Sequence, residues 1–543
     1  MHGLMMDKQL SIASIAEFAE LQFPDTEIVS VTADNPLHRY TYRDCFRRSR
    51  QLADVLTKRG YEPATRIATL AWNDYRHMEC YYGISGAGFV CHTVNPRLFP
   101  EQLTYIINHA DDKLMFVDPM FMPLLEKLKP AITKVETFVV FTDEQSMPAS
   151  DLPGAISYEA FIADGDPSFV WPEFDEHRAS ALCYTSGTTG NPKGVLYSHR
   201  STLLHALVGN TGAVLALSPR DVVLPVVPMF HVNAWGMPYA APMVGTKIVY
   251  PGPKMGDGEA LYNLMESEGV TMSAGVPTVW LALLAYARGA DKTFSTLKRT
   301  LVGGAAVPAA VIAEFRDRHG IDVQQGWGMT ETSPIGSVNK VLPKFDNLTP
   351  DEWLELRTKA GRAVFGVEMK IVNDAGETLP WDGESAGALK VRGPWICSDY
   401  FGLAGDSEAH AEPGWFDTGD VATIDPDGYM AITDRTKDVI KSGGEWISSI
   451  DLENAAVGHP QVAEAAVIGV AHPKWTERPL LIVVAEGDRP SKDELIEFLS
   501  DKVAKWWLPD DVVYIEEIPH TATGKILKTA LRKQFADYQL PTV

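Results

Sequence analysis

At 543 residues, the chain is too long for one simple hydrophobic core, so two or more domains are expected. Apolar residues form 45% and charged residues 22% of the sequence, which is ordinary for a globular protein. The formal net charge of −23 argues against nucleic acid or an anionic membrane as a general partner. The scattered cysteines form no CxxC pair and no zinc-spaced cluster, which favours reduced thiols and a cytoplasmic location: Cys45, Cys80, Cys91, Cys183 and Cys397.

The N-terminal half is predicted to be α/β. Residues 1–23 mix polar and apolar positions as an amphipathic surface helix does, not as a signal peptide does. No apolar run reaches the roughly 18 residues of a membrane span. In the segment 41–60, Thr41 and Asp44 have capping-box spacing and Gly60 follows the helical pattern. Short apolar runs then alternate with helical patterns, which predicts buried sheets, at 67–71, 114–117, 138–141, 222–227, 248–250 and 301–302.

A glycine- and hydroxyl-rich loop, read as YTSGTTGNPKG over Tyr184–Gly194, follows an apolar strand directly. Glycines let backbone N–H groups converge on an anion, hydroxyls add donors, and a lysine adds charge, so the loop is expected to bind phosphate. A flexible linker is the alternative, but linkers rarely follow a buried strand. The spacing from Gly187 to Lys193 excludes a GxxxxGK[ST] loop.

This string resembles the phosphate-binding signature of the adenylate-forming superfamily, which includes acyl-CoA synthetases, peptide-synthetase adenylation domains and luciferases. The resemblance implies a large multi-layer α/β N-terminal domain, a small mobile α+β C-terminal lid, and the use of ATP with Mg²⁺. It assigns Thr185 to catalysis and Thr188 to Mg²⁺. It assigns phosphate contacts to Thr185, Ser186, Gly187, Thr188, Thr189, Gly190 and Lys193.

The stretch PMFHVNAWG over 228–236 resembles the aromatic and histidine motif that gates the acyl pocket of this superfamily. A lone histidine beside phenylalanine is usually a core residue. In this context we expect His231 to shape the acyl site rather than to carry protons, and Trp235 to form a pocket wall, whereas His199 is expected to be structural.

The stretch VGGAAVP over 302–308 resembles the strand end that borders adenine and the acyl pocket, although it could simply be a strand ending in a turn. The resemblance assigns Val302 and Gly303 to the acyl pocket, and it assigns nucleotide contacts to Gly304, Ala305 and Ala306.

In GWGMTET, over 326–332, an aromatic residue between glycines offers a flat face to a base, and a carboxylate close behind suits Mg²⁺. Read alone, such a tryptophan is more often packing. The stretch resembles the superfamily's GYGxTE motif with Trp327 in the tyrosine position, which keeps a stacking surface. It assigns Glu331 to catalysis and Mg²⁺, and it assigns nucleotide contacts to Gly326, Trp327, Gly328, Met329 and Thr330.

WFDTGD over 415–420 and Asp434-Arg435 match the TGD and DR motifs of the superfamily, which assigns ribose binding to Asp420 and Arg435. A turn cap and a solvated surface charge are the alternatives for either residue alone. After Asp434-Arg435 the sequence changes to a compact pattern of short strands and one helix. We therefore expect an N-terminal domain over 1–434, a hinge over 435–437 and a lid over 438–543. Strands are predicted at 463–470, 480–484 and 512–515, and a helix at 492–506.

PHTATGKI over 519–526 matches the superfamily's PxxxTGK motif, which makes Lys525 the expected catalytic lysine for attack at the α-phosphorus. Family precedent places the hinge at Lys437 and has the lid rotate for the second half-reaction, with Lys441 then facing the active site. Gly443 and Gly444 would let the pantetheine arm of CoA pass, with Trp446 nearby.

These resemblances imply an AMP-forming ligase that joins a carboxylic acid to CoA through an acyl-adenylate. Because the sequence ends shortly after Lys525 without a carrier-protein segment, a stand-alone enzyme is expected. A luciferase-like oxygenase would share every motif, whereas a nucleotide sensor would be expected to lack Lys525 or Glu331. Many relatives form dimers, so a homodimer is also considered.

The acyl pocket is expected to be short and apolar. No aspartate occurs in the 231–236 stretch to pair with an amino acid's ammonium group. Aromatic, methionine and aliphatic residues would line the site: Trp235, Met237, Val302, Trp327 and Met329. The chain resembles bacterial medium-chain fatty-acyl-CoA ligases and the 3-methylmercaptopropionate-CoA ligases of marine bacteria. The thioether acid is the preferred substrate, then medium-chain fatty acids, then aryl acids.

Overall fold

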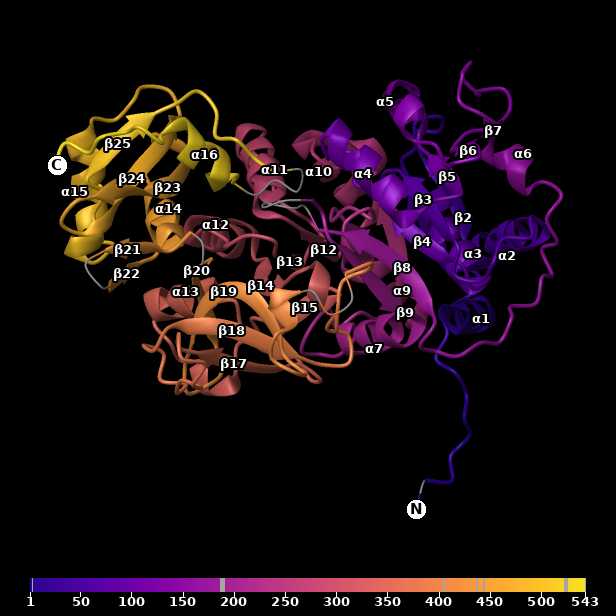
Figure 1. Cartoon of the computed structure of the whole chain (residues 1–543), viewed down its shortest axis with the longest axis horizontal. Coiled ribbons are helices and arrows are strands. Elements are labelled where there is room, and N and C mark those ends of the chain that lie inside the picture. Colours follow the sequence, from indigo (N-terminus) through magenta and orange to yellow (C-terminus); the bar gives the residue numbers. More distant parts are fainter. Residues whose placement is uncertain are drawn as a thin grey trace.

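The computed structural model describes residues 1, 3–185, 191–403, 405, 407–435, 438–442, 445–521 and 526–542, without the side chains of Glu445 and Trp446. Two large sheets, a smaller antiparallel sheet and a C-terminal α+β unit follow one another along the chain (Figure 1). The expected α/β architecture with a smaller C-terminal domain is confirmed. Among the described residues, no helix has both the length and the apolar character needed to cross a bilayer.

The first sheet is mostly parallel, with an antiparallel hairpin at one edge. In spatial order its strands are β7 (Ile156–Ser157), β6 (Thr137–Val140), β5 (Leu114–Val117), β3 (Arg66–Leu70), β4 (Val90–Thr93), β8 (Ala179–Tyr184) and β9 (Gly194–Ser198). The hairpin pairs Tyr184 with Gly194, so the expected phosphate loop is the connection between β8 and β9.

The second sheet has a parallel centre and antiparallel strands at both ends. In spatial order its strands are β16 (Arg362–Ala363), β15 (Ile335–Val338), β14 (Asp322–Gly328), β13 (Arg299–Val302), β12 (Met272–Gly275), β10 (Val222–Pro225), β11 (Lys247–Tyr250), β1 (Glu27–Ser30) and β2 (His38–Thr41).

Helices fill the space between the two sheets and cover their outer faces. Neighbouring residues of a strand face opposite sides. Ile67 and Leu301 therefore join the core between the sheets, while Ala68 and Val302 join the two outer cores. The helices of this part are α1 (Ile12–Gln22), α2 (Tyr42–Lys58), α3 (Tyr75–Gly86), α4 (Pro100–Ala110), α5 (Met122–Leu128), α6 (Tyr158–Ile162), α7 (His199–Gly209), α8 (Val232–Trp235), α9 (Met237–Met243), α10 (Gly258–Glu268), α11 (Pro277–Gly289), α12 (Ala309–His319) and α13 (Pro350–Thr358).

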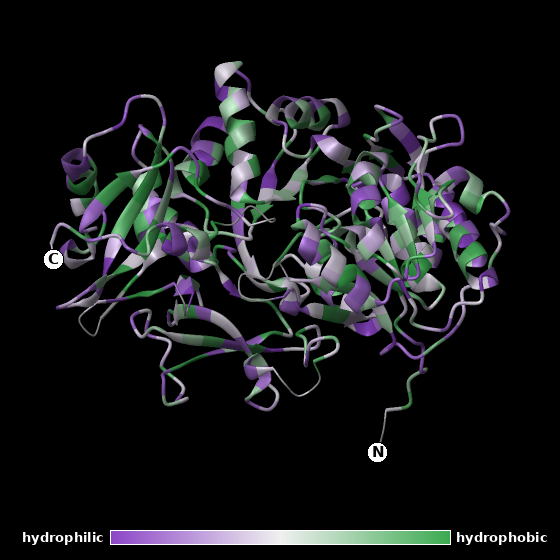
Figure 2. Cartoon of the chain, turned by 45° about the horizontal axis from the view of Figure 1, so that its top comes forward, coloured by the Kyte–Doolittle hydropathy of each residue, from purple (hydrophilic) through white to green (hydrophobic). Residues whose placement is uncertain are grey.

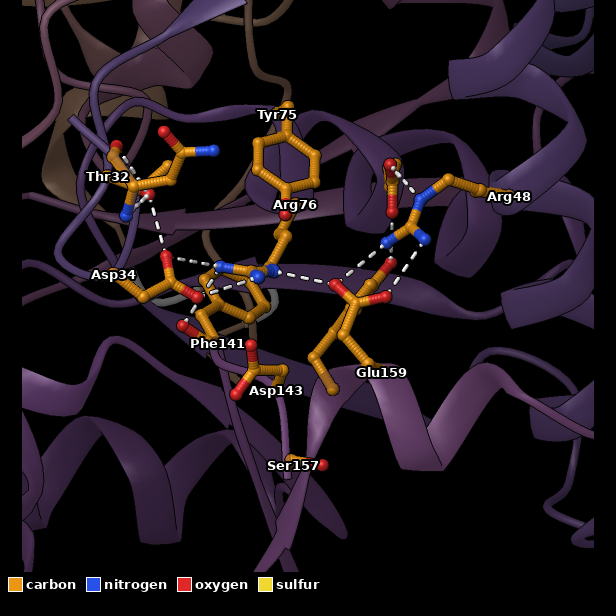
Figure 3. A network of polar contacts seen from close by, with 12 residues as sticks. Thr32, Asp34, Arg48, Tyr75, Arg76, Phe141, Asp143, Ser157 and Glu159 are labelled. Atoms are coloured by element: carbon orange, nitrogen blue, oxygen red, sulfur yellow. Dashed lines mark hydrogen bonds and ion pairs between the residues drawn. The ribbon is translucent and has the colours of Figure 1, made fainter. Parts of the chain in front are cut away.

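A polar network ties the two large sheets together at one end (Figure 3). Arg76 of α3 pairs with Asp34, between β1 and β2, at 2.9 Å and with Glu159 of α6 at 3.1 Å. Arg48 of α2 pairs with the same Glu159 at 2.9 Å and with the buried Glu79 at 2.8 Å. The network therefore fixes three helices of the middle layer against both sheets.

The smaller antiparallel sheet contains β17 (Glu368–Val372), β18 (Gly387–Arg392), β19 (Phe416–Ile424) and β20 (Met430–Arg435). The C-terminal unit follows it and lies at one end of the molecule (Figure 1). Its sheet has β22 (Glu445–Ile447), β21 (Ile440–Ser442), β24 (Thr476–Ala485) and β23 (Val462–His472), with β25 (Asp511–Tyr514) beside β24. Its helices are α14 (Ser449–Val457), α15 (Lys492–Ser500) and α16 (Lys528–Gln534). Hydrophobic residues concentrate in the strands of the molecule (Figure 2).

Two predicted helices have different bounds in the structure. The N-terminal helix begins only at Ile12, and its buried face packs on the core. The helix expected over 492–506 ends at Ser500, and the chain continues through a separate 3₁₀ turn at Lys505–Trp507. Ser500 and Asp501 favour helix ends over helix interiors, which explains the break within a continuing apolar pattern. The helix expected over 41–60 is confirmed as α2, with its capping box formed by Thr41 and Asp44.

Candidate active site

A cleft of about 1300 Å³ lies between the N-terminal sheets and the C-terminal unit. It gathers the strand ends and loops that the sequence motifs single out. The sequence-predicted residues that line it are Thr185, Lys193, His231, Trp235, Gly303, Gly304, Ala305, Ala306, Gly326, Trp327, Gly328, Met329, Thr330, Glu331, Asp420 and Arg435.

The stem of the β8–β9 loop is held by paired hydrogen bonds. The Thr185 backbone N–H donates to the Lys193 carbonyl at 2.9 Å, and the Lys193 N–H donates to the Thr185 hydroxyl at 3.1 Å. The Thr185 hydroxyl therefore accepts a hydrogen bond that closes the stem of the loop. The phosphate contacts expected of Ser186, Gly187, Thr188, Thr189 and Gly190 lie outside the described residues.

Asp420 connects two other predicted nucleotide residues, Trp327 and Arg435. Its Oδ2 accepts a hydrogen bond from the Trp327 indole N–H at 2.8 Å, and its Oδ1 pairs with Arg435 Nε at 2.7 Å. The antiparallel register of β19 and β20 places Asp420 directly opposite Arg435. The indole itself packs on Gly336, where a β-carbon would lie 2.2 Å from the ring. Trp327, expected to stack on the base, is thus connected by a hydrogen bond to the charged pair expected at the ribose, Asp420 and Arg435.

Glu331 is buried, and Tyr400 links it to Lys193 at the end of the β8–β9 connection. The Tyr400 hydroxyl donates to Glu331 Oε1 at 2.7 Å, and the Lys193 ammonium lies 4.7 Å from the centre of the Tyr400 ring. Burial raises the pKa of Tyr400, with the Glu331 carboxylate acting in the same direction, so this hydroxyl remains a donor. Tyr400 therefore orients the carboxylate that borders the loop.

Three of the four residues expected at the acyl pocket line the cleft, and the fourth, Val302, does not. Trp235 packs against Gly303, where a β-carbon would lie 3.0 Å from the indole, so any larger residue there would press the two apart by a few tenths of an ångström. His231 also lines the cleft. Val302 does not, because strand alternation places it in the outer core with Trp280, and Leu301 lines the cleft instead.

The C-terminal unit contributes His520 and Ile526, on either side of the segment 522–525, to the border of the cleft. His520 and Ile526 line the cleft and form a β-bridge with each other, so both ends of the 521–525 loop meet at its border. Lys525 itself, like Lys437, Gly443 and Gly444, lies outside the described residues, and so does the Trp446 side chain. Lys441 is described, is exposed, and is not among the residues that line the cleft.

Comparison with protein families decides the family. The AMP-binding enzyme family matches residues 17–401, and its C-terminal domain matches residues 451–525. The chain belongs to the AMP-binding enzyme family.

This AMP-binding enzyme is 53% identical over 538 residues to 3-methylmercaptopropionyl-CoA ligase of Ruegeria pomeroyi, covering 99% of each chain. It is 50% identical over 541 residues to medium-chain-fatty-acid–CoA ligase of Ectopseudomonas oleovorans, covering 99% of this chain and 98% of the relative. The structure of the anthranilate CoA ligase AuaEII with anthranoyl-AMP has the same fold, with a TM-score of 0.85 at 24% identity over 97% of this chain and 98% of that chain. The family resemblance expected from the motifs is confirmed.

The residues of this AMP-binding enzyme fit a Mg²⁺ site whose ligands come partly from substrate phosphates, rather than a site enclosed by protein ligands alone. Among the described residues, no group of three or more His, Cys, Asp or Glu side chains is arranged to hold a metal. Mg²⁺ commonly takes one or two carboxylates together with substrate phosphates. Glu331 suits that arrangement, because Tyr400 engages only one of its carboxylate oxygens. Thr188, the other predicted ligand, lies outside the described part of the chain.

Three supporting residues of the site were not predicted from the sequence. Tyr400 orients Glu331, the Tyr197 hydroxyl donates to the Thr330 carbonyl at 2.7 Å, and the Val307 N–H donates to Gln325 Oε1 at 3.1 Å. Tyr400 and Tyr197 are distant in sequence from the residues they hold, so no local pattern identifies them. Gln325 could have been found, because it directly precedes the glycine motif at 326.

Proposed function

We propose that this enzyme is an AMP-forming acid–CoA ligase. The observation that carries the proposal is the single cleft that brings together the Trp327–Asp420–Arg435 unit, Glu331 and the Trp235 wall. A nucleotide whose ribose meets Asp420 would have its phosphates near Glu331 and the β8–β9 loop. An acid seated against Trp235 would then present its carboxylate to the α-phosphorus.

In the first half-reaction, a carboxylate oxygen attacks the α-phosphorus of ATP, and pyrophosphate leaves. Glu331 would hold Mg²⁺, which offsets charge on the phosphate oxygens. Asp420 and Arg435 would fix the ribose, and Lys525 would stabilise the pentavalent transition state. In the second half-reaction, the CoA thiol attacks the acyl carbon and loses its proton, and AMP leaves.

The domain limits and the hinge belong to the same proposal. We assign 1–434 to the N-terminal domain, 435–437 to the hinge and 438–543 to the lid. The lid face that flanks Lys525 meets the cleft, which is the arrangement expected for adenylate formation. Rotation about Lys437 would then bring Lys441, Gly443, Gly444 and Trp446 to the cleft for the CoA step.

For the acid, 3-methylmercaptopropionate is the first candidate and medium-chain fatty acids are the second. Full-length relatives that are 53% and 50% identical carry these two activities in their names. The close approach of Trp235 to Gly303 favours the shorter acid, because it leaves little depth between the indole and the backbone behind it.

CoA-dependent release of AMP from ATP tests the function across acetate, butyrate, pentanoate, hexanoate, octanoate, 3-methylmercaptopropionate, benzoate and phenylalanine. Pentanoate matches the thioether acid in length, so a higher kcat/KM for 3-methylmercaptopropionate than for pentanoate would establish recognition of sulfur. A peak at octanoate would contradict the preferred substrate and leave the ligase mechanism intact.

No AMP release with any acid, from folded protein that binds ATP, would contradict the ligase function. Light emission or CoA-independent oxygen consumption would then indicate a luciferase-like oxygenase. If neither is observed, a nucleotide sensor remains as the explanation. Light scattering of the purified protein tests the homodimer.

A further inference from the structure

A left-handed turn forms part of the acyl wall. Val232, Asn233, Ala234 and Trp235 have φ values of 46°, 51°, 49° and 55°, and Gly236 follows at 78°. L-amino acids avoid this region because the β-carbon crowds the following carbonyl oxygen, and a β-branched valine is especially disfavoured. Such a run persists only where the surrounding structure fixes it.

The turn faces the cleft on one side. Val232 and Trp235 line the cleft, and the Trp235 indole touches the backbone at Gly303. The indole lies so near Gly303 that an added β-carbon would be only 3.0 Å from it, which leaves little room for Trp235 to move inward. Relaxation of the turn is therefore expected to move Trp235 away from Gly303 and to deepen the pocket.

On its other side, the turn is held through the buried side chain of Asn233. The Tyr81 hydroxyl, from α3, lies within hydrogen-bond distance of Asn233 Oδ1 at 3.3 Å and also donates to the Met229 carbonyl oxygen. The Cys183 sulfur, from β8, lies 3.5 Å from the same Oδ1. Burial raises the pKa of Cys183 to about 11, so at neutral pH it is a thiol that can donate this hydrogen bond.

The end of the turn is fixed by glycine. The Gly236 N–H donates to the Asn233 carbonyl oxygen at 3.0 Å, and a β-carbon at Gly236 would lie 2.8 Å from His205 Nδ1. Asn233 is therefore the described residue of the turn whose side chain is anchored by two other elements, and asparagine is among the non-glycine residues that best tolerate left-handed backbone.

We propose that Tyr81, which donates to the Met229 carbonyl oxygen and lies beside Asn233 Oδ1, and Cys183, which contacts the same Oδ1, are positioning residues that hold the 232–236 turn left-handed, and that this clamp limits the length of acyl chain the enzyme accepts. The inference rests on the proposed ligase function and names a determinant of its chain-length selectivity. Neither residue is among those that line the cleft. Both act by fixing the distance between Trp235 and Gly303.

The test is Tyr81→Phe, which removes only the hydroxyl. The readout is the ratio of kcat/KM for octanoate to kcat/KM for butyrate. We expect this ratio to rise at least tenfold over wild type while the KM for ATP stays within twofold. A purely structural role would lower all activities together and leave the ratio unchanged.

Tyr239→Phe is the matched control. The Tyr239 ring stacks on Tyr81 with centroids 5.7 Å apart, and its buried hydroxyl has no hydrogen-bond partner in the described part of the chain. Its ratio should remain within twofold of wild type. A Tyr81→Phe ratio no different from that of Tyr239→Phe would overturn the proposal.

A second pair of variants keeps the test decisive if Tyr81→Phe does not fold. Asn233→Ala removes the anchor and disfavours left-handed backbone, so the ratio should rise at least tenfold. Asn233→Gly also removes the anchor, and glycine tolerates the left-handed region without being held in it, so its ratio should rise as well, but by less than in Asn233→Ala. An unchanged ratio in Asn233→Ala would also overturn the clamp.

The two levels of failure are distinguishable. An active enzyme whose ratio does not respond to these variants overturns the clamp alone. A wild-type enzyme that adenylates no acid overturns the proposed function, and the clamp falls with it.

Discussion

Asp420 carries more of the nucleotide site than a single ribose contact requires. It is almost fully buried, and each of its carboxylate oxygens is engaged, one by the Trp327 N–H at 2.8 Å and one by Arg435 at 2.7 Å. A buried carboxylate that loses one of its donors pays a large desolvation cost. The tryptophan in place of the superfamily's tyrosine therefore supplies an N–H donor as well as a flat face.

Trp327→Phe should raise the KM for ATP about tenfold with little change in kcat. The variant keeps an aromatic face but loses a hydrogen bond to a charged group, worth roughly 1.5 kcal/mol. Steady-state kinetics at saturating acid and CoA measure this. Trp280→Phe is the control, because the buried Trp280 N–H has no partner among the described residues, and it should leave the KM for ATP unchanged. Equal ATP KM values for both variants would contradict the role given to the indole N–H.

At the scale of elements, α3 is unusual in being buried along its whole length, Tyr75–Gly86. Its N-terminal cap is Asp74, whose side chain accepts a hydrogen bond from the His77 N–H at 2.8 Å. Burial raises the pKa of the Asp74 carboxyl to about 7. A helix that carries Tyr81 and Arg76 thus begins at a carboxylate that is costly to ionise.

Asp74→Asn should stabilise the protein at pH 8 and make little difference at pH 4. Between about pH 4 and pH 7 the folded state binds this proton and the unfolded state does not, so the wild type loses stability as pH rises through that window. Asparagine caps helices as well as aspartate and remains neutral. We expect a gain of roughly 2 kcal/mol in the free energy of unfolding at pH 8, measured by urea denaturation.

Asp257→Asn is the control for this effect. Asp257 is the exposed cap of α10, where it accepts from the Ala260 N–H at 3.0 Å. Its substitution should change stability by the same small amount at both pH values. A gain for Asp74→Asn that did not grow with pH would show that burial of the carboxylate is not its cause.

The motifs predicted the fold, and most of the described candidate residues line one cleft, because glycines, prolines and caps are local signals. The capping box of α2 and the glycines around Trp327 are read directly from neighbouring residues. Val302 was misplaced because a short apolar run does not show which face of the sheet each residue takes. Tyr400 could not be found, because its contact with Glu331 depends on tertiary packing. The left-handed turn at 232–236 could not be predicted either, because valine disfavours the left-handed conformation that the fold imposes on Val232.

At the scale of the whole molecule, a polar chain fixes the C-terminal unit beside the smaller sheet. The Ser449 N–H at the start of α14 donates to Asp434 at 2.8 Å, and Lys528 of α16 pairs with Glu453 at 2.8 Å and also contacts Ser449. Lid rotation would have to break contacts of this kind. The two half-reactions should therefore respond differently when the connection at 435–437 is stiffened.

Lys437→Pro should preserve adenylate formation and abolish thioester formation, because proline fixes φ at the proposed hinge. Pyrophosphate release measures the first half-reaction, and transfer from isolated acyl-adenylate to CoA measures the second. Lys437→Ala leaves the backbone free and should retain both. Equal loss of both half-reactions in Lys437→Pro would refute the hinge.

The last two residues of β20 face different partners. Arg435 pairs with Asp420 in the cleft, whereas the adjacent Asp434 accepts from Ser449 of the C-terminal unit. If occupation of the ribose site strengthens docking of the lid by some factor, docking of the lid must strengthen nucleotide binding by the same factor, because coupling free energy is reciprocal. Substitutions at Ser449 would then weaken ATP binding although Ser449 does not contact ATP. The Asp434-Arg435 dipeptide would thereby couple nucleotide binding in the cleft to docking of the C-terminal unit.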